Sequence, residues 1–231
     1  MNSIPDDPYP APAAHDPIVE LFPGVFMVRG SLQMNSFMRF SRNMVVVRAG
    51  EDLTVLNSMR LSPAGEAELE RLGNVRHVLR LGYFHGRDDA YYVSRYGARF
   101  WAAPGSRTEP GPAATNALEP DTPLPLANAQ LFSFRATRHP ELAVLLEQDG
   151  GILITCDALQ HHADRRFSSL FARLAMPLMG FPLKMLIGPL WLKAMTPKNK
   201  PDSLLHAFER LLDLEFAHLL PAHGSARCDD A

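Results

Sequence analysis

The sequence contains very few cysteines and no large excess of charge of either sign. Among 231 residues only Cys156 and Cys228 are cysteines, too few for a disulfide framework, which favours a reducing, cytoplasmic compartment. The formal net charge is −2, so the overall charge indicates neither nucleic acid nor an anionic membrane surface as a partner. These absences direct attention to a small-molecule substrate.

The N-terminus lacks the basic start and the apolar run of a secretory signal. Residues 1–16 are acidic and rich in proline. We therefore predict a flexible arm over residues 1–20 and a single domain over 21–231, since this length and an apolar content of 46% suit one globular domain.

An uninterrupted apolar run long enough to cross a membrane is also missing. The best candidate, residues 176–195, is long enough but contains three prolines and two lysines, Lys184 and Lys193. We predict that the apolar stretch over 167–195 forms short helical pieces covering a core or a pocket. Contact with a membrane surface is the less favoured alternative.

Apolar runs bounded by turn residues predict strands in both halves of the chain. The predicted strands are 24–32, 39–49, 53–56, 75–81 and 99–103, then 129–136, 142–146, 152–155 and 216–220. Between the two groups, residues 105–128 are rich in Pro, Gly, Ala, Asn and Thr and predict a long loop.

Capping residues and periodicity predict helices between these strands. Ser62 and Pro63 begin one helix that Gly73 ends, and a second covers 88–96 before Gly97. Leucines and a phenylalanine at helical spacing predict a third helix over 203–214. Strands paired with helices in both halves favour an α/β (α+β) fold. We expect a four-layer αββα sandwich, in which two mixed β-sheets pack together and helices cover their outer faces.

Histidine and aspartate side chains follow the ends of four predicted strands. His85 comes after strand 75–81, His139 after 129–136, Asp157 after 152–155, and His223 after 216–220. Loops at strand ends can gather such side chains into one site. Imidazole and carboxylate are suitable ligands for zinc and iron.

This order of elements and ligands resembles the metallo-β-lactamase superfamily over residues 25–225. The family's first loop reads His-x-His-x-Asp-His, and here it reads His85-Gly86-Arg87-Asp88-Asp89-Ala90. The first histidine and the aspartate are retained, whereas Arg87 and Ala90 replace the other two histidines. An aspartate that the family often has earlier in the chain is Asn57 here.

The resemblance implies a reduced, mononuclear metal site that binds one zinc ion, with iron as an alternative. Its implied ligands are His85, Asp89, His139, Asp157 and His223. Asp89 would also act in catalysis by orienting a water or taking its proton. Arg87 cannot bind a metal and would hold a substrate carboxylate or phosphate, or pair with Asp88 or Asp89.

Three functions are compatible with this set of residues. The first is a hydrolase of a small ester, thioester or lactone that uses a metal-activated water. The second is a non-catalytic protein of the same fold that has lost the metal and binds a small anionic ligand or a partner. The third is oxidative chemistry at a single iron. The sequence contains no glycine-rich phosphate loop, so a nucleotide cofactor is not expected. The oligomeric state does not follow from the sequence.

The remaining histidines and Cys156 have simpler interpretations. The adjacent pair His161 and His162 is expected in a solvated loop. A structural role is expected for three histidines in predicted strands and a helix: His77, His206 and His218. Cys156 has no basic partner in the sequence pattern, so we predict a buried, unreactive thiol.

Overall fold

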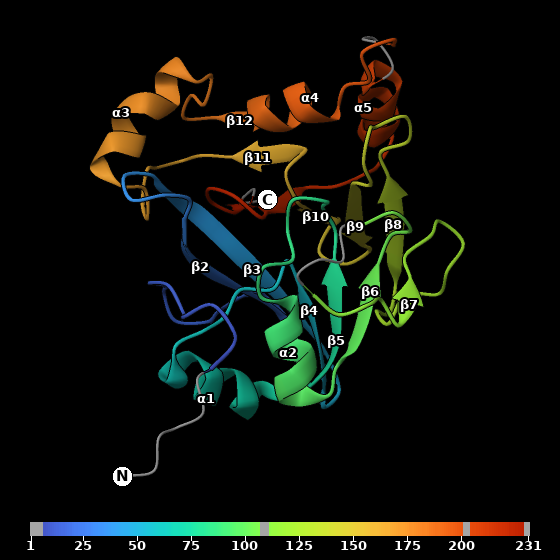
Figure 1. Ribbon diagram of the computed structural model, residues 1–231. Coiled ribbons are helices and arrows are strands. Elements are labelled where there is room, and N and C mark those ends of the chain that lie inside the picture. Colours follow the sequence, from blue (N-terminus) through green and yellow to red (C-terminus); the bar gives the residue numbers. More distant parts are fainter. Residues whose placement is uncertain (1–6, 107–110, 201–203, 229–231) are drawn as a thin grey trace.

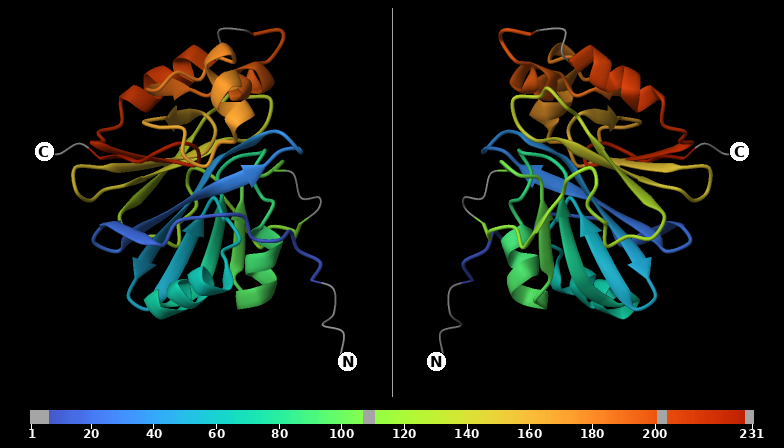
Figure 2. Two further views of the ribbon diagram at one scale, coloured as in Figure 1. Left: turned by 90° about the vertical axis from the view of Figure 1, so that its left-hand side faces the viewer. Right: turned by 90° about the vertical axis from the view of Figure 1, so that its right-hand side faces the viewer.

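Two β-sheets with helices on their outer faces make up the protein (Figure 1). The structure is a computed structural model that describes residues 7–106, 111–200 and 204–228. Figure 2 shows the layers edge-on, with helices below one sheet and above the other. This arrangement confirms the predicted αββα sandwich.

The first sheet has seven strands that follow one another in chain order. They are β1 (Val19–Phe22), β2 (Val25–Gln33), β3 (Arg39–Ala49), β4 (Asp52–Leu56), β5 (Asn74–Arg80), β6 (Arg99–Ala102) and β7 (Asn116–Ala117). The pairs from β1 to β4 are antiparallel, and the pairs from β4 to β7 are parallel. The carboxyl ends of β4, β5 and β6 therefore lie at one edge of the sheet.

The second sheet has five strands in the order β14-β13-β10-β9-β8. They are β8 (Ala129–Ser133), β9 (Leu142–Leu146), β10 (Ile152–Thr155), β13 (His218–Pro221) and β14 (Arg227–Cys228). A separate two-stranded ribbon pairs β11 (Leu159–His161) with β12 (Met185–Ile187). In the five-stranded sheet β10 and β13 are parallel neighbours, so their carboxyl ends lie side by side.

Helices cover the outer face of each sheet. The elements are α1 (Pro63–Leu72) and α2 (Asp89–Tyr96) on the first sheet, and α3 (Leu170–Leu178), α4 (Pro189–Met195) and α5 (Leu205–Leu212) on the other side of the molecule (Figure 1). Helix α1 begins as predicted, because the Ser62 side chain accepts a hydrogen bond from the Gly65 amide and Pro63 occupies the first turn.

Strands that are apolar at successive positions bury both faces. In β3, Val45 and Val47 belong to the core between the sheets, whereas Met44 and Val46 pack toward α1 and α2. In β10, Ile154 faces the central core and Leu153 faces the core under α4 and α5. Since side chains alternate along a strand, such runs require a layer on each side of the sheet.

Most predicted elements are present, with corrections at several ends. The strand predicted over 129–136 stops at Ser133, and Ala136 has a positive φ of 67°. The helix predicted over 203–214 covers Leu205–Leu212, and its first predicted residue, 203, lies outside the described residues. The short strands β1, β7, β11, β12 and β14 were not predicted. The apolar stretch 167–195 forms α3, β12 and α4, as short pieces. None of the described helices is long and apolar enough to cross a membrane.

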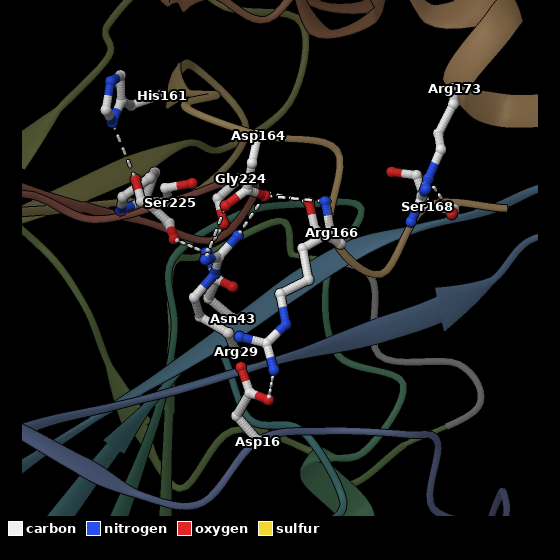
Figure 3. A network of polar contacts seen from close by, with 12 residues as sticks. Asp16, Arg29, Asn43, His161, Asp164, Arg166, Ser168, Arg173, Gly224 and Ser225 are labelled. Carbon is white, nitrogen blue, oxygen red and sulfur yellow. Dashed lines mark hydrogen bonds and ion pairs between the residues drawn. The ribbon is translucent and has the colours of Figure 1, made fainter. Parts of the chain in front are cut away.

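Residues 7–18, within the segment predicted as an arm, contact the first sheet and α1. The His15 ring accepts a hydrogen bond from the Ser62 amide at 2.8 Å, and His15 forms a β-bridge with Gly30. Asp16 pairs with Arg166, which Figure 3 shows beside the Arg29–Asp164 ion pair. The predicted boundary at residue 20 falls inside β1. The predicted flexibility of this arm stays a prediction, and residues 1–6 lie outside the described residues.

Candidate metal centre

Two of the predicted ligands reach the same place because their strands are parallel neighbours in register. Thr155 at the end of β10 lies opposite Pro221 at the end of β13. Asp157 and His223 each follow two residues later, so both emerge at the same edge of the second sheet. His85 comes from the first sheet, in the loop between β5 and α2. The site therefore lies where the two sheets meet.

His85, Asp157 and His223 form a tight triangle of possible metal-binding atoms. The Nε2 atoms of His85 and His223 lie 3.1 Å apart. The Asp157 carboxylate lies 3.1 Å from His223 Nε2 through Oδ1 and 3.5 Å from His85 Nε2 through Oδ2. Ligands bonded to zinc at about 2.0–2.1 Å in a tetrahedron are separated by about 3.3 Å. The triangle thus has the dimensions of one face of a zinc site, and the donor set fits zinc or iron.

The protonation of the triangle also suits a cation. His223 Nδ1 donates to the Ser41 carbonyl at 2.7 Å, which leaves the Nε2 lone pair facing the triangle. Burial lowers the pKa of His85, which favours the neutral imidazole, although Asp157 opposes this shift. The two Nε2 atoms lie 3.1 Å apart, and two nitrogen lone pairs at that distance repel each other unless a proton or a metal ion lies between them.

Asp157 stays ionised despite its burial. Burial acts to raise its pKa, but interactions with His85 and His223 outweigh that effect and lower the pKa below its usual range. The same contacts explain why the pKa of His223 is raised, although burial acts to lower it. A carboxylate that stays charged in a buried site attracts a cation.

Cys156 and Glu141 surround Asp157 on its buried side. Cys156 is fully buried, as predicted, and burial raises the pKa of its thiol well above the usual value. Its Sγ nevertheless lies within 4.8 Å of possible ligand atoms of His85 and Asp157. Glu141 Oε1 accepts hydrogen bonds from the Asp157 and Ala158 amides at 2.8 and 2.9 Å. Burial, and then Asp157, raises the pKa of Glu141 well above its usual value. Glu141 thus fixes the backbone that carries Asp157.

Asp89 is engaged in a different cluster. One of its oxygens forms an ion pair with Arg80 Nε at 2.6 Å, and the other accepts a hydrogen bond from the Ser58 hydroxyl. Neighbouring Asp88 pairs with Arg42 at 2.9 Å, and all four charged side chains are buried. Both oxygens of the Asp89 carboxylate are therefore engaged, and among the described residues Asp89 forms no hydrogen bond or ion pair with the triangle. The predicted roles of Asp89 as ligand and catalyst therefore have no structural support.

His139 and Arg87 also lie in settings that differ from the expected ones. The His139 ring stacks on Tyr83 with the ring centres 3.9 Å apart, and the described part of the chain shows no contact between His139 and the triangle. Arg87 lines a separate cavity of about 290 Å³ beside Arg39 and Arg60. Arg87 is exposed, and among the described residues Asp88 and Asp89 pair with Arg42 and Arg80 instead.

The triangle opens into an apolar cavity of about 450 Å³. Its polar lining includes Ser41, Gln160 and His162. Its apolar lining includes Leu32, Phe40, Phe84, Met176, Phe181 and Trp191. A predominantly apolar wall with a few polar groups is typical of a small-molecule site.

His162 corrects one of the sequence expectations. The pair His161 and His162 was predicted in a solvated loop, but His161 ends β11 and His162 is buried beside the cavity. Burial lowers the pKa of His162 to about 4. Sequence analysis also missed Ser41 and Glu141, which orient His223 and Asp157. A serine within a strand and a glutamate just before one do not signal such a role, because it depends on pairing between distant segments.

Comparison with solved structures identifies the fold. A metallo-β-lactamase from Erythrobacter litoralis superposes with a TM-score of 0.59 at 15% identity, covering 91% of this chain and 86% of that chain. FIM-1 from Pseudomonas aeruginosa, in its mono-zinc form, gives a TM-score of 0.63 at 14% identity, covering 96% and 92%. A metallo-β-lactamase from Hirschia baltica gives 0.60 at 11% identity, covering 92% and 93%.

The chain therefore has a metallo-β-lactamase-like fold and is a divergent example of it. No protein-family model matches the sequence, and no curated protein matches it. At these identities the likeness establishes the fold, and the function has to be argued from the site.

Proposed function

We propose that the protein is a metal-dependent hydrolase of a small ester, thioester or lactone, acting at a mononuclear site. The observation that carries this proposal is the triangle of His85, Asp157 and His223, whose edges of 3.1–3.5 Å match one face of a tetrahedral zinc site. Similar folds in metallo-β-lactamases support the same class of chemistry. Zinc is the first candidate and iron the second.

His85, Asp157 and His223 would hold the ion. When bound, zinc supplies Lewis-acid activation of a water near neutral pH. The chain itself fixes the three donors: the Ser41 carbonyl holds the His223 ring, and Glu141 holds the backbone of Asp157. Such supporting contacts keep ligands in one orientation and strengthen metal binding.

The cavity determines how a substrate would be bound. Its apolar wall would hold an acyl or ring group next to the triangle and exclude water from it. His162 faces this cavity as a neutral imidazole at neutral pH, since its pKa is about 4. Its Nε2 contacts the Gln160 side-chain oxygen at 3.1 Å, so the other ring nitrogen carries a lone pair that can accept a proton. We assign Arg87 no role in binding this substrate, because it lines the separate cavity of about 290 Å³.

Chelation and reconstitution test this proposal. The purified chain would be stripped with a chelator, dialysed, and assayed on ester, thioester and lactone panels before and after addition of zinc or iron(II). We expect hydrolysis that appears only after metal addition and that His85→Ala abolishes. His161→Ala serves as the matched control and should retain activity, because His161 contacts Ser225 rather than the triangle. Equal hydrolysis with and without metal would contradict the proposal.

One observation favours a non-catalytic binding protein as the second candidate. Asp89, which the family resemblance implies as a ligand, pairs with buried Arg80 at 2.6 Å, so a carboxylate expected at the metal belongs to a salt-bridge cluster. If the wild-type chain binds no metal either as purified or after reconstitution, the binding-protein candidate replaces the hydrolase. Its ligand would then be sought in the cavity of about 450 Å³.

A further inference from the structure

Helix α3 has apolar side chains on its outer surface as well as on its inner one. Ala172 and Met176 are buried, as expected for the side that packs on the protein. Leu170, Leu174 and Leu178 recur at every fourth residue on another side and are 75%, 70% and 91% exposed. Soluble surfaces rarely keep such a continuous apolar stripe unless it binds something.

The apolar surface continues beyond α3 into the next elements of the chain. Leu183 is 57% exposed, and Ile187 in β12 and Leu192 in α4 are also exposed. These segments form the outer layer of the molecule, opposite the layer that contains α1 and α2 (Figures 1 and 2). Prolines and turns thus divide residues 170–195 into the short elements α3, β12 and α4, and several leucines on these elements are exposed to solvent.

The same segment is strongly cationic. Every lysine of the chain lies in it, at positions 184, 193, 198 and 200. Three arginines at 165, 166 and 173 bring the count over 165–200 to seven cations, and this stretch contains no aspartate or glutamate. The rest of the protein is acidic, because the net charge of the whole chain is only −2.

The lysines are available to an external partner. All four are exposed, and none has a side-chain hydrogen bond or ion pair within the described portion of the chain. The start of the segment, by contrast, forms ion pairs with the rest of the protein. Asp164 pairs with Arg29 and Asp16 pairs with Arg166, so these contacts anchor the start of the layer to β2 and to the N-terminal segment (Figure 3).

We propose that this cationic apolar face, defined by Leu170, Leu174, Leu178, Leu183, Lys184 and Lys193, docks on the surface of an anionic lipid bilayer. The leucines would enter the boundary between headgroups and acyl chains, and the lysines would lie against lipid phosphates. A second copy of the chain is a poorer occupant, since two such faces would oppose cations with no carboxylate to compensate them. The sequence alone favoured a cover for a pocket, and the structure adds the outward leucines.

The cavity of the candidate metal centre opens beside this face. Leu190 of α4 lines the cavity and is 53% exposed, while Met176 and Phe181 line it from within the same segment. One segment thus forms both part of the apolar wall of the cavity and the proposed lipid-binding surface. Docking does not depend on the proposed hydrolase, because it requires only this surface.

Vesicle co-sedimentation of the full chain tests the proposal. One set of vesicles contains equal parts of phosphatidylcholine and phosphatidylglycerol, and the other contains phosphatidylcholine alone. We expect binding to the anionic vesicles that weakens as salt is added. The double variant Lys184→Glu/Lys193→Glu should weaken the partition coefficient roughly tenfold or more. The control Arg71→Glu/Arg99→Glu reverses two charges on α1 and at the start of β6, and should leave binding close to wild type.

A second pair of variants separates the apolar contribution from charge. Leu174→Ser/Leu178→Ser should weaken vesicle binding at high salt, where the lysines are screened. Val19→Ser is the control, because Val19 is 50% exposed but lies in β1. Circular dichroism and the melting temperature would establish that each variant is folded. Absence of binding to anionic vesicles would overturn the proposal, as would a wild-type dimer that Leu174→Ser/Leu178→Ser converts to monomer without vesicle binding.

Discussion

Two buried clusters near the junction of the sheets contain carboxylates, and they differ in what neutralises those carboxylates. Asp88 and Asp89 face guanidinium groups of Arg42 and Arg80 at 2.9 and 2.6 Å. Among the described residues, the Asp157 carboxylate forms ion pairs with two imidazoles alone, at 3.1 and 3.5 Å. The first cluster is electrostatically complete within the protein, whereas the second lacks a permanent cation.

This difference distinguishes the arginine cluster from the candidate metal site. Buried charges are tolerated where they are paired, and the arginine cluster satisfies that condition without any ligand. The triangle keeps Asp157 ionised and orients His223 through Ser41, so its donors are prepared for a cation that the chain does not provide. A pair of carboxylates in a sequence motif therefore does not by itself mark a metal site.

The largest expected effect is on metal occupancy. Asp157→Ala removes the central donor and should reduce zinc occupancy after reconstitution from about one ion per chain to nearly none. Asp89→Asn should leave occupancy per folded chain close to the wild-type value, because its oxygens already bind Arg80 and Ser58. Plasma mass spectrometry of both variants measures this contrast. Equal loss in the two variants would mean that Asp89 is also a ligand.

The next effect is on stability. Asp89→Asn removes the buried ion pair between Asp89 and Arg80 and should lower the free energy of unfolding by about 3 kcal/mol. Denaturant titration measures the change. Asp52→Asn provides the control, since Asp52 and Arg76 are 57% and 62% exposed and their pair should contribute less than about 1 kcal/mol. A similar small change in both variants would refute the structural role given to the buried cluster.

A smaller effect concerns pH and His162. Its pKa is about 4 in the fold, against 6.5 for an unperturbed histidine. The unfolded chain therefore takes up this proton first, so stability should fall as the pH drops from about 6.5 to about 4. The loss due to His162 should be roughly 2–3 kcal/mol. His162→Asn cannot titrate, and denaturant titrations across this range should show a correspondingly shallower pH dependence. Identical pH profiles would contradict the assignment.

The smallest expected effect is at Ser41. Its hydroxyl accepts a hydrogen bond from the Gly224 amide at 2.9 Å, while its carbonyl holds His223. Ser41→Ala removes only the hydroxyl, so we expect about 1 kcal/mol of lost stability and less than about a tenfold loss of zinc affinity. Zinc titration with a competing chelator measures the affinity. A loss as large as that in His223→Ala would show that the hydroxyl, rather than the carbonyl, orients the ring.

The sequence predicted the layers well because the relevant signal is local. Runs such as 142–146 and 152–154 are apolar at every position, and this requires burial on both faces of a strand. The ends of the predicted strands 152–155 and 216–220 also located Asp157 and His223. Short strands such as β7 and β11 carry no comparable periodic signal, so they were missed.

The partners of the site residues were harder to predict. Arg80 ends a strand that was predicted correctly, yet its pairing with Asp89 depends on how the loop at His85 and Gly86 folds back. Gly86 has a φ of 126°, and a Cβ there would lie 2.2 Å from the Arg80 guanidinium carbon. Stacking of His139 on Tyr83 likewise depends on two loops meeting. Spacing along the chain does not contain this information.

The most direct test of the account is elemental analysis of the purified, untagged chain by plasma mass spectrometry, before and after reconstitution. The triangle of His85, Asp157 and His223 predicts about one zinc or iron ion per chain. Two ions per chain would contradict the structural role assigned to the Asp89–Arg80 cluster. No bound metal, even after reconstitution, would contradict the central claim that the triangle is a metal site.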